Sequence, residues 1–201
     1  DLTLQAGDCI WWDFHDWGGS VFSPAILGAY PRPFVKGGII AASAGGEEKA
    51  RRLKDLLAQR TGAPVSLVAI NEGVIKERPS PTIIIGKWSE LKEYASLRDL
   101  LLKPARSGIF CAFSDEGLRG LDSEMHPGDV LYREGSACIA ATASGLGDLN
   151  PLWIVIGWDD AGLQRALAFL ARGQINPVTA WGTIVYAKGN ISLPLPDERI
   201  R

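Results

Sequence analysis

Apolar residues along most of the chain follow two alternating patterns, one typical of buried strands and one typical of amphipathic helices. Short continuous apolar runs predict strands that are covered on both faces. They occur at residues 38–42, 65–70, 109–113, 137–142 and 181–187. Between the first two runs, residues 46–60 place leucines and alanines on one helical face. This spacing predicts a helix that ends at Gly62.

Two segments in the middle of the chain share one plan. Residues 82–91 and 153–162 each contain an apolar strand that stops at a glycine, passes a tryptophan and opens a helix. Ser89 and Asp159 stand near the expected helix starts, where their side-chain oxygens can accept hydrogen bonds from free N–H groups. The second of these helices is predicted over residues 159–172.

Strands that are apolar throughout need helices on both faces of their sheet. We therefore predict an α/β fold for residues 37–201, a three-layer domain with a mainly parallel or mixed sheet. Residues 71–81 are predicted to be a solvated loop, and residues 114–131 a polar, hairpin-like stretch. Residues 1–36 are rich in Trp, Pro and Gly and predict a separate, small β-rich aromatic segment.

Composition narrows the functional classes. The 201 residues are 46% hydrophobic and 22% charged, with 21 basic and 23 acidic side chains and a net charge of -2. A nucleic-acid partner is therefore not expected, because no basic face is available for phosphate. No apolar run approaches the roughly 20 residues that cross a bilayer, so no transmembrane segment is predicted in this chain.

The three cysteines, Cys9, Cys111 and Cys138, are widely spaced and form no C-x-x-C motif. Cys111 and Cys138 lie in apolar runs, which favours buried free thiols that pack as small hydrophobes. A disulfide between two of the three remains an alternative, as do metal binding and catalysis.

Motifs for nucleotide binding and for nucleophilic catalysis are absent from the sequence. Neither G-x-G-x-x-G nor the P-loop pattern occurs, and G-x-S-x-G does not occur either. Residues 89–92 match S-x-x-K, but a helix cap at Ser89 explains that match. No cofactor is predicted.

Asp13, His15 and Asp16 are the strongest candidates for chemistry. An imidazole with carboxylates could ligate a metal, and His15 with Asp13 or Asp16 could serve a hydrolase. On an extended chain Asp13 and His15 share one face while Asp16 takes the other. At most two ligands then come together, which leaves a hydrogen-bonded structural histidine as the alternative.

Three of the seven tryptophans, Trp11, Trp12 and Trp17, surround those polar residues. Two interpretations stay open. The aromatic rings could pack in a core, or they could bind a planar ligand or a partner together with the nearby Tyr30 and Phe34.

A family resemblance follows from stretches that occur in a fixed order. They are W-W-D-F-H-D-W at residues 11–17, P-R-P-F at 31–34, I-G-K-W-S at 85–89, S-G-I-F at 107–110 and P-L-W-I-V-I-G at 151–157. In these the chain resembles the C-terminal region of bacterial extracytoplasmic proteins that have an upstream transcobalamin-like domain. The first stretch would then close that upstream domain. Members with cysteines near the first α/β helix differ from this chain, which has Ser43 and Ala44 there.

The resemblance implies a secreted or lipid-anchored protein, often encoded beside energy-coupling-factor vitamin or metal transporters, and it transfers no catalytic residue. We therefore expect a non-enzymatic, extracytoplasmic ligand-binding or transporter-accessory domain, linked to corrinoid or metal uptake. Its partner would be a small-molecule ligand or a membrane transporter subunit. The alternatives are the hydrolase using His15 and a structural cell-surface module.

Overall fold

The computed structural model describes residues 27–145, 148–173 and 181–196. The strands are β1 (Gly38–Ala42), β2 (Val65–Ala69), β3 (Thr82–Lys87), β4 (Cys111–Ser114), β5 (Gly117–Gly120), β6 (Ala137–Thr142), β7 (Leu152–Gly157), β8 (Gly182–Tyr186) and β9 (Gly189–Leu193). The α-helices are α1 (Glu47–Thr61), α2 (Glu72–Glu77), α3 (Trp88–Leu91), α4 (Ala95–Leu101), α5 (Pro104–Ser107) and α6 (Asp160–Arg172).

A seven-stranded mixed sheet forms the centre of the fold, in the order β2-β1-β3-β7-β6-β8-β9. β1 pairs in parallel with β2 and β3, and β3 pairs in parallel with β7. β6 is antiparallel to both of its neighbours, and β9 is antiparallel to β8. The described residues of β6 and β7 are buried throughout, as expected for strands covered on both faces.

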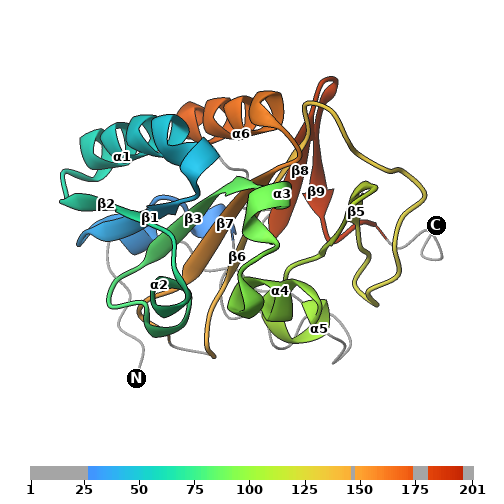
Figure 1. Ribbon diagram of the computed structural model, residues 1–201, viewed down its shortest axis with the longest axis horizontal. Helices are drawn as coiled ribbons and strands as arrows, with labels where there is room; N and C mark the ends of the chain where they lie inside the picture. Colours follow the sequence, from blue (N-terminus) through green and yellow to red (C-terminus); the bar gives the residue numbers. More distant parts are fainter. Residues whose placement is uncertain (1–26, 146–147, 174–180, 197–201) are drawn as a thin grey trace.

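Helices cover both faces of this sheet, which confirms the predicted three-layer α/β fold. On one face α1 and α6 lie side by side (Figure 1), and their leucines share a core with Ile40, Ile83 and Val155. On the other face Leu91 of α3 and Leu97 of α4 pack in a second core, which includes the β4–β5 hairpin. Residues of one strand therefore alternate between two cores.

Of the three helix ends predicted from the sequence, two are confirmed by the structure and one is wrong. Gly62 ends α1 with φ +67°, a left-handed conformation that favours glycine. Asp159 caps α6, because its side chain accepts a hydrogen bond from Gly162 N–H at 2.7 Å. The cap predicted at Ser89 is wrong. Extended backbone continues through Lys87, so α3 begins at Trp88 and Ser89 already lies inside the first turn.

Four helices and strands, α2, β9, α4 and α5, were not anticipated from the sequence. The predicted loop at 71–81 contains α2, whose first turn is capped by Asn71, which accepts a hydrogen bond from Val74 N–H at 3.0 Å. Burial of Ile75 holds this short helix against the sheet. β9 adds a strand to the edge of the sheet beside β8. In the predicted hairpin-like stretch, residues 117–120 form β5, which pairs with β4 from the predicted strand at 109–113 in a two-stranded sheet separate from the central one.

The described end of the predicted aromatic segment packs on the main domain. Leu27, Tyr30 and Phe34 belong to the same core as α1 and α6. Residues 1–26 lie outside the described residues, so the domain boundary after residue 36 stays a prediction.

Candidate functional site

Fold topology points first to the carboxyl ends of β1 and β3. In open α/β sheets ligands commonly bind where the strand order reverses direction, and the order β2-β1-β3 places that reversal between β1 and β3. Ser43 to Gly46 follow β1 at this edge, and Lys87 ends β3.

A carboxylate of the chain itself fills that location. Glu90 accepts a hydrogen bond from Gly45 N–H at 3.3 Å and forms an ion pair with Lys87 Nζ at 3.1 Å. The hydrogen bond to Glu90 raises the pKa of Lys87. A Cβ at Gly45 would lie 2.4 Å from Glu90 Oε1, so a larger residue there would make the carboxylate shift. An external anion would have to displace Glu90.

An open cavity lies near the opposite edge of the sheet, between α2, α4, α5 and the end of β6. Its volume is about 360 Å³, which is at the small end of the range for small-molecule pockets. The pairing of Thr142 with Leu152 puts the end of β6 beside the start of β7. Figure 1 shows the three helices grouped on this side of the molecule. The lining includes Ile75, Lys76, Arg78, Ser96, Asp99, Leu100, Lys103, Arg106, Ser107, Thr142, Ala143 and Ser144.

Thr142 is the most informative residue of the lining. It follows Cys138 and Ala140 at a spacing of two, and both of those pack in the core beneath α3 and α4. The threonine is 1% exposed, and its Oγ1 has no hydrogen-bond partner among the described residues. A buried hydroxyl without a partner costs free energy. It therefore marks a place where a ligand could supply the missing hydrogen bond.

The neighbouring wall is held by an ion pair. Arg78 contacts Asp148 at 3.1 Å and also donates to Ser144 Oγ, and the Arg78 and Asp148 side chains are only 10% and 15% exposed. Burial alone would raise the pKa of Asp148. Backbone hydrogen bonds from Ser144 and Asn150, with the Arg78 charge, outweigh burial and lower it. Asp148 is thus a stable anion that fixes Arg78.

The backbone of Arg78 adopts φ +36°, in the left-handed region. Such a conformation in a residue other than glycine costs about 1–3 kcal/mol and persists when its surroundings hold it. The contacts with Ser144 and Asp148 provide that restraint. Arg78 therefore links the end of α2 to the segment after β6, across one wall of the cavity.

Of the ligand residues predicted from the sequence, the two that the structure describes, Tyr30 and Phe34, do not line this cavity. Trp11, Trp12 and Trp17, and the candidate metal ligands Asp13 and His15, lie outside the described residues, as does Asp16. Tyr30 and Phe34 are 5% and 0% exposed. Their ring centres lie 5.5 and 5.7 Å from that of Trp153. Both rings pack in the core, and neither presents a face to solvent.

Two other predictions can be followed in the described residues. Cys111 and Cys138 are free and buried, which confirms the packing interpretation for these two thiols. Burial raises the pKa of Cys111 well above its ordinary value. Within residues 27–145, 148–173 and 181–196, no three His, Cys, Asp or Glu side chains come close enough to hold a metal.

Sequence reasoning missed the cavity because its lining comes from four separate elements. None of its residues forms a motif with its neighbours along the chain. The sequence contained only a weak signal for it. Four cations, Lys76, Arg78, Lys103 and Arg106, occur in two short segments that lack a strong helical period. Only the packing of α2, α4 and α5 brings them together.

Comparison with known proteins adds no family assignment. No family model matches the chain, and no curated protein is significantly similar to it. Among the helices that the structure describes, none has the length and apolar character needed to cross a membrane.

Proposed function

We propose that this chain is a non-enzymatic ligand-binding domain and that its ligand is a small molecule held in the cavity between α2, α4, α5 and the end of β6. The observation that carries the proposal is that Thr142, in the cavity lining, has a buried hydroxyl without a hydrogen-bond partner among the described residues. Apolar side chains beside hydroxyls and charges support it, since this mixture is common in binding pockets.

The proposal includes an extracytoplasmic location and an accessory role beside a membrane transporter, both of which rest on the family resemblance. A corrinoid is several times larger than the cavity, so the cavity favours a smaller ligand. Binding of a corrinoid by Trp11, Trp12 and Trp17 stays a separate prediction. Tryptophan fluorescence during titration with corrinoids would test it.

Binding in the cavity can be tested by filling it. Ala143 lines the cavity, whereas Ala105 is exposed on α5 and does not. The full chain would be screened by ligand-observed NMR against small carboxylates, amides and vitamins. We expect Ala143→Leu to weaken any hit at least tenfold, because the added atoms occupy ligand space, and Ala105→Leu to leave it unchanged. Absence of hits for the wild type, or equal binding by both variants, would refute a ligand site here.

The Thr142 hydroxyl gives a second prediction, in which stability and binding change in opposite directions. Thr142→Val removes a buried hydroxyl without a partner, so we expect the free energy of unfolding to rise by about 1 kcal/mol. Affinity for a cavity ligand should fall, because the ligand loses its hydrogen-bond partner. Urea denaturation and ligand-observed NMR measure the two effects.

Thr82 provides the matched control. It is equally buried, but its Oγ1 donates to Ser80 O at 2.8 Å. Thr82→Val should therefore lower the free energy of unfolding by about 1 kcal/mol. If Thr142→Val destabilised the protein to the same extent, its hydroxyl would already be satisfied and would not mark a ligand position.

A further inference from the structure

Positive charge is concentrated around the cavity. Four of its lining side chains are cations, Lys76, Arg78, Lys103 and Arg106, and one is a carboxylate, Asp99. The chain as a whole carries a net charge of -2. The excess of cations is therefore a local feature of this site and not a consequence of composition.

Two of the four cations already have electrostatic partners. Arg78 is paired with Asp148. The charge of Lys76 acts on Glu72, one helical turn before it, and contributes to the lowered pKa of that carboxyl, which owes most to its hydrogen bond with Ser96. These two cations stabilise the protein's own anions.

Lys103 and Arg106 differ from that pair. Both are exposed, and neither has an ion-pair partner in the part of the chain that the structure describes. Lys103 immediately precedes α5, and Arg106 lies within it, three positions later. A guanidinium can bind a carboxylate or phosphate through two parallel hydrogen bonds, and an ammonium adds a flexible point charge.

We infer that the ligand is a small organic anion, with its acid group bound by Lys103 and Arg106 and its apolar body against Ile75 and Leu100. This inference rests on the proposed function and adds the chemical class of the ligand. The Thr142 hydroxyl supplies a hydrogen bond to a polar atom of the ligand. Asp99 opposes the anion, but the cations outnumber it.

Matched probes separate charge from shape. Benzoate and benzamide have nearly the same size, as do hexanoate and hexanamide, but only the acids are charged. Titration of the full chain by ligand-observed NMR at low ionic strength should show each acid binding at least tenfold more tightly than its amide. The preference should shrink as NaCl is added, because salt screens exposed charges. Inorganic phosphate, which has no apolar body, should bind more weakly than either acid.

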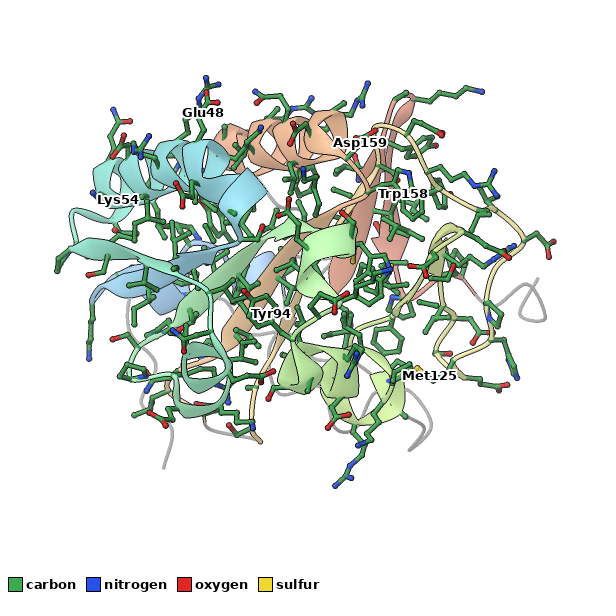
Figure 2. All side chains as sticks on the ribbon, in the orientation of Figure 1. Glu48, Lys54, Tyr94, Met125, Trp158 and Asp159 are labelled. Carbon is green, nitrogen blue, oxygen red and sulfur yellow. The ribbon has the colours of Figure 1, made fainter. Side chains whose placement is uncertain are left out.

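Variants locate the charge effect. In Lys103→Ala/Arg106→Ala the acids should lose at least tenfold in affinity while the amides keep theirs. Arg51→Ala/Lys54→Ala removes the same two charge types from α1, and Lys54 lies there on the far side of the sheet from α4 and α5 (Figure 2). This control should keep the acid preference.

The results of these titrations can refute the anion inference without refuting the proposed ligand-binding function. If amides bind as well as acids and Ala143→Leu abolishes both, the cavity binds ligands but the anion inference is wrong. Tighter binding of benzylamine than of benzoate would also overturn it, in favour of Asp99 as the recognition group. If no probe binds and no probe responds to Ala143→Leu, the proposed function itself fails.

Discussion

Gly162→Ala should lower the free energy of unfolding by about 3 kcal/mol, although alanine is the better helix former. Helix propensity alone predicts a gain of about 0.8–1 kcal/mol for this change. Gly162, however, is in the first turn of α6 against the start of β6, where an added Cβ would lie 1.9 Å from Ser136 O and 2.6 Å from Ser136 C. Both contacts are with backbone, so no side chain can rotate away. Overpacking of this kind typically costs about 1–3 kcal/mol, occasionally more.

The clash also threatens a hydrogen bond. Ser136 O accepts from Trp158 N–H at 2.9 Å, which ties the start of β6 to the turn between β7 and α6. Moving that carbonyl to admit a methyl group would weaken this bond and add about 1 kcal/mol to the cost. Trp158 and Asp159 mark this turn in Figure 2.

Urea denaturation gives the sign of the effect. Gly145→Ala is the control, because a Cβ there meets no atom of the other described residues within 4 Å, and it should leave stability unchanged or slightly higher. An increase in stability for Gly162→Ala would show that helix propensity dominates and that α6 can move away from β6.

Local and periodic signals made much of the fold predictable. The buried strands, the Asp159 cap and the end of α1 at Gly62 each depend on a few neighbouring residues, and the sequence displays all of them. Ser89 shows the limit of such reasoning. The cap position depends on where extended backbone ends, and pairing of Lys87 with Gly157 extends β3 past the point that the sequence indicated.

The cavity could not be predicted for a different reason. Its defining feature is that the Thr142 hydroxyl has no hydrogen-bond partner among the described residues, which is a property of the packed structure. In the sequence, Thr142 simply ends an apolar run. The distinction between Arg78, which has Asp148, and Arg106, which has no ion-pair partner among the described residues, likewise appears only when distant segments meet.

Carboxylates of the chain itself lie at the carboxyl ends of the parallel strands. Asp159 and Asp160 place carboxylates at the start of α6, where they disfavour an external anion, and Glu90 occupies the space beside Gly45 after β1. The fold thus uses its own carboxylates where related topologies bind ligands. The cationic cavity near the opposite edge is left as the stronger site for an external anion.

Trp153→Ala should have the largest effect on stability, a loss of about 4 kcal/mol. Trp153 is in β7 at the centre of the sheet and is 1% exposed. Truncation of a buried tryptophan to alanine typically costs about 3–5 kcal/mol, because it removes apolar contact and leaves a cavity. Its ring also contacts Tyr30 and Phe34, so the variant should loosen the segment before β1 from the sheet. Chymotrypsin should then cleave after Phe34 faster than in the wild type.

Trp153→Phe keeps an aromatic ring at this position but removes the indole N–H. Trp153 Nε1 has no hydrogen-bond partner among the described residues, so losing it removes an unfavourable burial that offsets part of the lost packing. We expect this variant to lie within about 1 kcal/mol of the wild type and to keep the segment before β1 protected from chymotrypsin. Trp158→Ala, at a half-buried tryptophan, should cost less than Trp153→Ala and leave cleavage after Phe34 unchanged. Equal cleavage in the Trp153→Ala variant and the wild type would mean that Leu27 and the contacts with α1 attach this segment to the domain. The ring contacts of Trp153 would then not be needed.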